Sequence, residues 1–600
     1  MGTFLEGCSQ PAMEMLQVFA AAAVVCLLLF SLRFKFQIWS SLGSGKTFLP
    51  PGSYGMPIVG ETMAYMWSMC TSRPTFMAER CKRYGDMFKT KLMGAKCVVA
   101  TAPDVIKFLL DHDGKQFQTG YPAGFKKVLG EYTTLSLHDE NWKRSRKFLV
   151  RSFRVDRLKA HIPVVEKLVL ENLATWEDTE VVCVRDKTKA LAFNVVAHFL
   201  LGSRLASSDA KEALREDFYT LTEGLFAMPV NFPTTKFSKA LKARARIIDT
   251  IEREVLSQPR APGDEDHYTD YMEYLREENH PATTEAMLLE QTRCHVLGLM
   301  FAGHQTAACT MLFAVKNLLE NPGVLENLLA EHDGIRRLKV FPVGRKIGLT
   351  WEEYKSMRYT QHVITETIRL ANPAALLWRE TKEDVQLNGY VVPKGWKMAC
   401  AIREAHHNPD YFSDPGLFDP SRHEKEINDP SGKLPFFGFG GGPRHCPGAE
   451  LARMEMSIFL YHLTTKFGME LELCGKEKMS FFPVPKMSRG LQVRLSNIQD
   501  CPSDLEAGQQ VLSPDVTTLP EFDPRFPDVR IDVPHVQAHV DPDHPDVITF
   551  TRLICPRHPN DRIVPQFCPY HPGCPRGRQF CPKHPHVALV TQLDYFADVL

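Results

Sequence analysis

The pattern of apolar and polar residues is helical over most of the chain. Between Asp104 and Leu329 apolar residues recur at helical spacing, as in the run Leu191–Leu201, so that they line one face of each helix. Short segments typical of β-strands are fewer; they cover residues 96–101, 385–392 and 491–495. The pattern therefore predicts a mainly α-helical domain with a minor β component.

One apolar segment near the start is long enough to cross a bilayer. Met15–Leu32 is an almost uninterrupted apolar run of about 18 residues, the length of a transmembrane helix. Glu6 and Glu14 precede it and basic residues follow, which places the following domain on the cytoplasmic side. We expect a lumenal segment at 1–14, an anchor at 15–32 and a linker at 33–52. A buried core helix is the alternative for the anchor.

Composition excludes one class of partner and indicates a redox compartment. The 600 residues include 71 basic and 71 acidic ones, so the formal net charge is zero and no nucleic-acid role is implied. Of the 16 cysteines, 11 are scattered before Asp500 at spacings that indicate no disulfide framework. This usage fits a reducing cytosolic domain.

The last hundred residues differ in composition from the rest. Residues 498–600 are rich in Pro, Asp, Val and His, and Cys-Pro-x-His-Pro recurs at 555–559, 568–572 and 581–585, a spacing of 13 residues. Such low-complexity sequence predicts a disordered extension. Zinc binding by the Cys and His residues and a partner-binding module are the alternatives.

A glycine-rich loop carries the strongest chemical signal. Phe439–Gly448 reads Phe-Gly-Gly-Gly-Pro-Arg-His-Cys-Pro-Gly and opens into a helical run from Ala449. Glycines permit left-handed backbone and close approach to a flat ligand, while backbone N–H groups at a helix start favour a thiolate. Cys446 is therefore a candidate axial metal ligand, and Arg444 a candidate partner for a carboxylate on the edge of a macrocycle.

This loop resembles the haem loop of the cytochrome P-450 family, Phe-x-x-Gly-x-Arg-x-Cys-x-Gly. Phe439, Gly442, Arg444, Cys446 and Gly448 occupy its fixed positions. The resemblance implies haem b with iron bound by the Cys446 thiolate, which favours O–O cleavage. It also implies a catalytic domain over 53–497, with the cytochrome P-450 fold.

Other motifs extend the resemblance. Glu366-Thr-Ile-Arg369 is similar to the family's K-helix pair, which Arg422 of the meander segment would join as a structural triad behind the haem. Trp142-Lys-Arg-Ser-Arg146 resembles the C-helix motif, in which both outer side chains can reach a haem propionate. Arg379 resembles a further propionate ligand, and a surface charge at a strand edge is the alternative for it.

The segment Met300-Phe-Ala-Gly-His-Gln-Thr-Ala307 resembles the oxygen-activating I helix. Ala302 and Gly303 lack bulk and would leave a slot for dioxygen and water beside the iron. Thr306 supplies a hydroxyl for proton delivery. The family's acid is replaced by Gln305, which organises water but carries no proton. His304 faces either the pocket or the core and solvent.

Five segments resemble a plant-type clan of brassinosteroid, abscisic-acid, gibberellin-precursor and triterpenoid oxidases. They are Leu49–Thr62, Tyr84–Thr90, Phe232–Pro233, Lys239–Arg246 and Met357–Glu366. The clan implies an apolar isoprenoid substrate, such as a sterol, brassinosteroid precursor or other terpenoid, that arrives from the bilayer. The candidate pocket residues are Phe125, Phe301, Ala302, Leu376, Leu377 and Trp378, for which ordinary core packing is the alternative.

The expected enzyme is a single-pass monooxygenase of the endoplasmic reticulum membrane. A separate flavoprotein reductase would supply electrons from NADPH by docking on the basic run Trp142–Arg154, for which an ordinary solvated face is the alternative. Phe48–Gly52 resembles the family's proline hinge, and Leu225–Pro233 its lipid-contacting loop. Because Gln305 replaces the acid, the alternative is a haem-thiolate isomerase or peroxide-using enzyme, or a ligand carrier without dioxygen activation.

Overall fold

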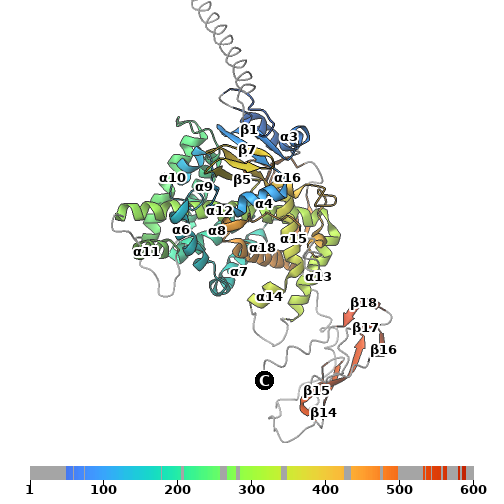
Figure 1. Ribbon diagram of the computed structural model, residues 1–600. Helices are drawn as coiled ribbons and strands as arrows, with labels where there is room; N and C mark the ends of the chain where they lie inside the picture. Colours follow the sequence, from blue (N-terminus) through green and yellow to red (C-terminus); the bar gives the residue numbers. More distant parts are fainter. Residues whose placement is uncertain are drawn as a thin grey trace, which may run out of the picture. The chain divides into compact units, whose positions relative to one another are not determined.

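The computed structural model describes most of the chain between residues 49 and 497 (Figure 1). The chain divides into two compact units, Met1–Cys501 and Pro502–Leu600. In the first, the described ranges are 49–57, 60–72, 74–177, 179–204, 208–256, 267–278, 284–338, 348–424, 434–472 and 477–497; in the second, only strands are described.

The first unit is built around α12 (Glu285–Glu320), a helix of 36 residues that crosses its middle (Figure 1). The Thr284 side chain caps α12 by accepting a hydrogen bond from the Met287 N–H. Leu297, Met300 and Met311 are buried there, and α12 packs most extensively on α8 (Val184–Leu201) and also on α15 (Arg358–Ala371) and α18 (Ala449–Lys466). The core therefore lies around α12, and the predicted mainly helical architecture is confirmed.

The other helices among the described residues surround this centre. They are α2 (Thr62–Met69), α3 (Phe76–Tyr84), α4 (Pro103–Asp111), α5 (Ala123–Leu129), α6 (Asp139–Ser152), α7 (Val155–Glu177), α9 (Ser208–Leu225), α10 (Lys236–Ile251), α11 (His267–Glu277), α13 (Pro322–Leu338), α14 (Trp351–Ser356) and α16 (Ile402–His406), with the short turns η1 (Gly202–Arg204), η2 (Glu252–Leu256), η3 (Pro420–His423) and η5 (Gly442–Arg444).

A five-stranded sheet lies at one end of the unit (Figure 1). Its order is β1 (Met87–Leu92), β2 (Ala95–Ala100), β8 (Lys397–Ala401), β5 (Leu376–Thr381) and β3 (Phe117–Thr119). Only β2 and β8 pair in parallel. In this register Arg379 of β5 lies between Met398 of β8 and Thr119 of β3, so the inner strand carries a charged side chain into the protein.

Three smaller sheets complete the first unit. One has the order β4 (Val181–Cys183), β12 (Gln492–Asn497) and β9 (Phe467–Leu471); the others are the pairs β6 (Val385–Leu387) with β7 (Tyr390–Val392) and β10 (Met479–Ser480) with β11 (Lys486–Met487). The segments predicted as strands at 96–101, 385–392 and 491–495 all fall on strands, the middle one as the hairpin β6–β7.

The capping box at Thr350 opens a separate short helix. Its side chain accepts from the Glu353 N–H, and the Glu353 carboxylate accepts from the Thr350 N–H. That helix, α14, ends at Ser356, and α15 begins after Met357 and stops at Asn372 in the left-handed conformation. The helix that carries Glu366 therefore does not extend back to the capping box.

In the second unit, strands β13 (Asp532–Val533), β14 (Val536–Asp541), β15 (His544–Cys555) and β16 (His558–Ile563) form one sheet, and β17 (Gln579–Cys581) pairs with β18 (His584–Leu589). Cys555 is the register partner of His558, and Cys581 that of His584. In two of the three Cys-Pro-x-His-Pro repeats the Cys and the His thus lie on paired antiparallel strands, and the third repeat lies outside the described residues. The predicted disorder of 498–600 is not confirmed.

Among the described residues, one helix, α12, is long and apolar enough to cross a membrane by length and composition. Most of its apolar window is buried inside the unit, which marks it as a core helix. The predicted anchor at 15–32 and the segment 1–14 lie outside the described residues.

Candidate active site

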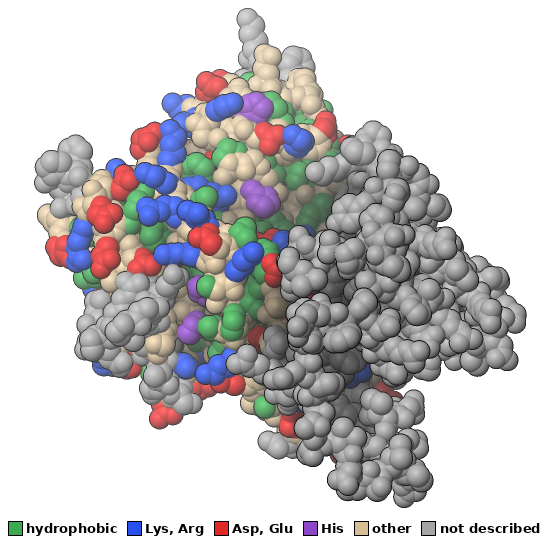
Figure 2. All heavy atoms as spheres, turned by 90° about the horizontal axis from the view of Figure 1, so that it is seen from below, with side chains coloured by type: hydrophobic (Ala, Val, Ile, Leu, Met, Phe, Trp, Pro, Cys, Tyr) green, Lys and Arg blue, Asp and Glu red, His purple; other side chains and the backbone are tan. Residues whose placement is uncertain are grey.

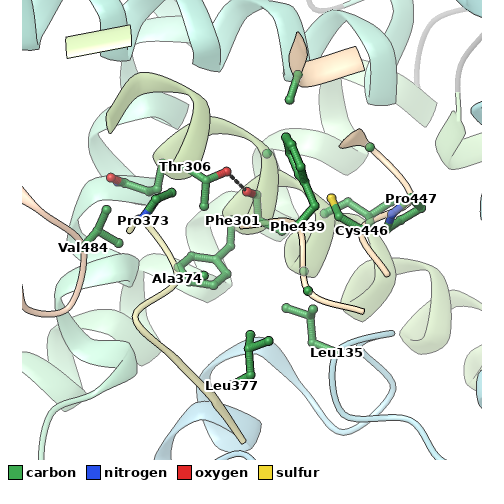
Figure 3. Close-up of a pocket in the computed structure, with 18 of the residues that line it drawn as sticks. Leu135, Phe301, Thr306, Pro373, Ala374, Leu377, Phe439, Cys446, Pro447 and Val484 are labelled. Carbon is green, nitrogen blue, oxygen red and sulfur yellow. Dashed lines mark hydrogen bonds between the residues drawn. The ribbon is translucent and has the colours of Figure 1, made fainter. Parts of the chain in front are cut away.

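A cavity of about 390 Å³ lies between α12, β5 and the loop that precedes α18. Figure 3 shows its labelled side chains around one space, with Thr306 and Val484 on one side and Cys446 and Pro447 on the other. Most of the lining is apolar, including Leu135, Phe301 and Leu377. The cavity therefore brings the predicted metal ligand and the predicted oxygen-activating helix to one site.

The loop that carries Cys446 is held by its own backbone and by α4. The Cys446 N–H donates to the Phe439 carbonyl over 2.9 Å, which closes the loop, and Phe439 lines the cavity beside it. Gly442 has a positive φ of 61°, and a Cβ there would lie 2.1 Å from the Leu110 carbonyl oxygen. This glycine is thus required by packing on α4, in addition to any approach to a flat ligand.

The ionisation of the Cys446 thiol is governed mainly by burial. Burial raises its pKa, while a hydrogen bond from the Gly448 backbone N–H and the charge of Arg146 act in the opposite direction. The backbone hydrogen bond near the helix start therefore favours the thiolate as predicted, but in the protein alone the loss of hydration outweighs it together with the charge of Arg146. A bound metal ion would deprotonate the thiol outright.

One face of α12 forms the opposite wall. Ala302, Gly303, Gln305 and Thr306 all line the cavity. The Thr306 hydroxyl donates to the Ala302 carbonyl over 2.7 Å (Figure 3). Its proton is therefore already used in a hydrogen bond, while its oxygen can still accept a hydrogen bond.

Gly303 and His304 of α12 also contribute to packing. A Cβ at Gly303 would lie 2.5 Å from Cγ2 of Val196 on α8, so the missing side chain permits close contact between these helices as well as leaving space in the cavity. His304 points away into the core, where its ring contacts Phe193 and Phe218 and its Nδ1 lies 2.6 Å from the Met300 carbonyl. The His304 side chain therefore faces the core and not the pocket, which the sequence alone left open.

One end of the cavity is strongly basic. Arg146, Arg379 and Arg444 line it together with Trp142, whose ring lies 4.6 Å from the guanidinium carbon of Arg444. Arg379 is buried, which excludes the surface-charge alternative. A carboxylate that the sequence did not single out, Asp113, lies between Arg379 and Arg444.

These charges fit the edge of a haem. Three guanidinium groups face one carboxylate, which leaves two positive charges without a partner among these groups. Buried charge without a partner is unfavourable, and the two propionates of a haem would supply the compensating charge. With Cys446 as the thiolate ligand, the residues present fit this cofactor.

The structure brings Glu366, Arg369 and Arg422 together. The Arg369 guanidinium donates to both Glu366 oxygens over 2.8 Å, and Arg422 Nε donates to one over 2.9 Å. His423 Nε2 lies 2.9 Å from the other oxygen. Burial raises the pKa of Glu366, but these hydrogen bonds outweigh it and hold the pKa at about 2.

This cluster joins α15 to the segment before η3. Arg369 also donates to the carbonyls of His406, Pro415 and Leu417. All of its N–H groups therefore have hydrogen-bond partners outside the cavity. None of the three predicted residues lines the cavity, so the arrangement suits a structural role.

The predicted pocket residues all line the cavity, namely Phe125, Phe301, Ala302, Leu376, Leu377 and Trp378. Phe125 stacks on Tyr121 and meets Phe301 edge to face, with ring centres 4.5 and 5.8 Å apart. Trp378 is also buried against the β-sheet core, so it serves both packing and lining.

Sequence reasoning missed a second buried carboxyl, Glu455 on α18. It lines the cavity, its Oε1 has no hydrogen-bond partner, and burial raises its pKa to about 8. The apolar spacing of Leu451, Met454 and Ile458 on α18 would have placed Glu455 on the buried face. For Asp113, which follows α4 in an irregular segment, no local pattern gives such a signal.

Comparison with known proteins agrees with this site. The family model described as Cytochrome P-450 matches residues 50–493. The chain is 34% identical to abscisic acid 8'-hydroxylase 1 of Arabidopsis thaliana over 76% of this chain and 92% of that protein. It is 30% identical to a cholesterol 22-hydroxylase of Paris polyphylla, over 81% and 99% respectively.

Among solved structures, the chain resembles the cyanobacterial CYP120A1 with retinoic acid bound. The TM-score is 0.67 at 26% identity, covering 76% of this chain and all of the other. The match spans the unit that contains the cavity, and the relatives named above are hydroxylases. The chain therefore belongs to the cytochrome P-450 family, in its plant-type clan, and is a monooxygenase by that membership.

Proposed function

We propose that this protein is a membrane-anchored monooxygenase that hydroxylates a neutral, apolar isoprenoid, such as a sterol, a brassinosteroid precursor or another terpenoid. Dioxygen and electrons from NADPH, delivered by a separate reductase, are the co-reactants. The observation that carries the proposal is the single cavity lined by Cys446, by the Thr306 face of α12 and otherwise mainly by apolar side chains. A haem bound there through Cys446 supplies the oxygen chemistry.

The distribution of charge in the cavity favours a neutral substrate. The cationic side chains that line it are Arg146, Arg379 and Arg444. Asp113 compensates one of these three positive charges, and two haem propionates would compensate the other two. The remaining wall is made of aromatic and aliphatic side chains, with Tyr65, Phe226 and Phe482 at the part formed by α2, the segment after α9 and the segment after β10. A substrate carboxylate would find no spare cation among the lining residues, which favours a sterol over an acid.

Two residues of α12 are suited to manage protons. Thr306 holds its own proton on the Ala302 carbonyl, so its oxygen accepts a hydrogen bond from water in the cavity. The Gln305 amide beside it donates to and accepts from the same water without titrating. In this proposal protons arrive through ordered water and pass at the Thr306 oxygen.

The reductase surface is proposed on α6. Of the basic residues in Trp142–Arg154, Arg146 faces the cavity, and Lys143, Lys147 and Arg154 form ion pairs with neighbouring acids. Arg144 and Arg151 remain as cations on the same helix. Figure 2 shows basic and acidic side chains intermixed over one face of the described protein.

Membrane association of the catalytic unit is proposed at two places. The first is the anchor at 15–32, which would hold the protein in the endoplasmic reticulum membrane with the hinge at 48–52 after it. The second is the segment between α9 and α10, where Met228, Val230 and Phe232 are 67, 51 and 61% exposed. Exposed apolar side chains of this size mark a contact surface, and a lipid bilayer is the proposed occupant.

The test is product formation in microsomes that contain the full chain. Microsomes are supplied with NADPH and a panel of neutral sterols, neutral terpenoids and isoprenoid acids, and products are identified by mass spectrometry. Cys446→Ala microsomes are the matched control, because that variant should not form the thiolate-ligated haem spectrum. A hydroxylated neutral product that requires Cys446 and NADPH supports the proposal.

Two outcomes would count against it. Turnover of the acids alone would overturn the substrate class while leaving the monooxygenase activity intact. Rearranged products formed with peroxide but never with NADPH would favour the isomerase or peroxide-using alternative, for which Gln305 at the acid position is the motivating residue.

A further inference from the structure

Asp113 is an almost completely buried carboxylate with no role in the motifs of the family. It follows α4 and precedes β3, and its side chain is 1% exposed. Arg444 Nε donates to its Oδ1 over 2.8 Å, while Arg379 Nε lies 2.5 Å from its Oδ2 without the alignment of a hydrogen bond. One carboxylate therefore holds two arginines that come from distant parts of the chain.

The contacts of these arginines fix where their remaining donors point. Arg444 also donates through Nη2 to the Leu137 carbonyl over 2.7 Å and lies over the Trp142 ring. Arg379 donates through Nη1 to the Trp378 carbonyl over 3.1 Å. Asp113 lies at the Nε atom of each arginine. Because both side chains also line the cavity, their remaining N–H groups are available to an anion bound there.

Charge provides a second argument. Without Asp113, the end of the cavity would carry three guanidinium groups and no carboxylate among the groups described above. Two arginines close together in a buried place repel each other, and a shared carboxylate offsets this repulsion. A negative charge near a redox cofactor also favours its more positive, oxidised state.

We propose that Asp113 is a positioning residue for the haem: it holds Arg379 and Arg444 against the propionate edge and, by its charge, lowers the reduction potential of the iron. The inference rests on the haem binding that family membership implies, and it is independent of the substrate.

The test compares holoprotein of the full chain with Asp113→Asn, which keeps the shape and removes the charge. Asp113→Glu keeps the charge, and Asp111→Asn is the matched control, because Asp111 is two positions away and exposed in an ion pair with Lys107. Two quantities are measured: the midpoint potential of the bound haem by spectroelectrochemical titration, and the rate of haem transfer to excess apomyoglobin.

Asp113→Asn should shift the midpoint potential in the positive direction and speed haem loss by about tenfold, the scale of lost support around a metal centre. Asp113→Glu should restore the potential, and Asp111→Asn should match the native protein. A purely structural role would lower the melting temperature and haem content but leave the potential of the retained haem unchanged.

An unchanged potential in Asp113→Asn, or an equal shift in Asp111→Asn, would overturn the proposal. If Asp113→Asn retains no haem, Asp113→Glu decides: a native potential supports the proposal, and a potential displaced in the positive direction despite the retained charge contradicts it. Neither readout depends on turnover, so failure here leaves the proposed function untouched.

Discussion

At the scale of single residues, the hydroxyl of Thr306 takes part both in a hydrogen bond within α12 and in the lining of the cavity. The hydroxyl donates a hydrogen bond to the Ala302 carbonyl one turn earlier in the helix, and its oxygen, which lines the cavity, can accept a hydrogen bond from water. Thr292 on the same helix has an equivalent bond to the Leu288 carbonyl over 2.9 Å but does not line the cavity. Comparing substitutions of Thr306 and Thr292 therefore separates an effect on the chemistry of the site from an effect on the stability of α12.

We expect Thr306→Ala to uncouple NADPH consumption from product formation, with hydrogen peroxide released instead of product. A loss of about 10²-fold in product per NADPH corresponds to roughly 2.7 kcal/mol, the range of one transition-state hydrogen bond. The measurement is product, peroxide and NADPH in the same reaction, with Thr292→Ala as the control. Full coupling in Thr306→Ala would remove this residue from oxygen activation.

Gln305 makes a separate prediction at the same site. Gln305→Glu should leave coupling unchanged or improve it, because it places a titratable group beside the water that is proposed to bind Thr306. Gln305→Leu should lower coupling by removing the amide that orders this water. The ratio of product to NADPH is measured for both variants, and equal coupling in the two would show that the water is ordered elsewhere.

Glu366 makes the free energy of unfolding depend on pH in a defined direction. Its pKa is lowered from 4.5 to about 2 in the folded state, so its contribution is fully present above pH 4.5 and is lost as the pH falls toward 2. Glu366→Gln leaves Arg369 and Arg422 buried without their carboxylate, which should cost about 3–5 kcal/mol at neutral pH.

Denaturant unfolding at neutral and acidic pH measures both effects. The Gln variant should lose less stability than the native protein on acidification, because the titrating group is gone. Glu140→Gln is the control, since Glu140 forms an exposed ion pair with Lys143, and solvent screening leaves such a pair little effect on stability. Equal losses of stability in the two variants would mean that the buried cluster does not stabilise the fold.

At the scale of elements, α6 has two faces with different tasks. One face carries Trp142 and Arg146 into the cavity, and the other carries Arg144 and Arg151. We expect Arg151→Glu to raise the KM for the reductase several-fold with little change in haem content, because long-range attraction to an acidic partner is reduced. The increase should shrink at high salt.

The control for that experiment is Lys242→Glu on α10, an exposed lysine on another helix. Initial rates at varied reductase concentration and two ionic strengths give the KM. A similar increase in both variants would indicate a general charge effect and would place the docking surface elsewhere.

At the scale of the whole molecule, the division at Cys501 predicts that the catalytic unit does not require the tail. The family match ends at residue 493, before that division. We expect deletion of 500–600 to leave the haem spectrum intact and turnover within about twofold, as for an independently folded unit. Loss of the haem on deletion, or one zinc ion per chain that disappears with the tail, would contradict this.

The N-terminal segment gives the complementary prediction. Deletion of 1–47 should release most of the protein from membranes while the haem site still assembles, with residual association through the exposed segment at 228–232. Fractionation in high salt and carbonate, compared with the full chain, measures the release. If the truncated protein stayed wholly with the membranes, the dominant anchor would lie outside 15–32.

The family and much of the site could be predicted from the amino-acid sequence. Cys446, Thr306 and the Trp142–Arg146 pair belong to short motifs, in which loop closure or helical spacing fixes which side chains lie together. The helical core also followed from the sequence, because burial on one face imposes its period on the apolar residues. The short strands were predicted where apolar residues adjoin or alternate with polar ones over a few positions.

The other features of the site depend on contacts between segments that are far apart in the chain. Asp113 meets Arg444 across 331 positions, and no local pattern encodes such a contact. The raised pKa of Cys446 follows from burial, which depends on everything packed around the loop. Gly442 and Gly303 were attributed to space for a ligand, yet their Cβ positions are also occupied by Leu110 and Val196. Spacing along a chain specifies its local geometry, whereas desolvation and charge pairing are set by which distant segments the fold brings together.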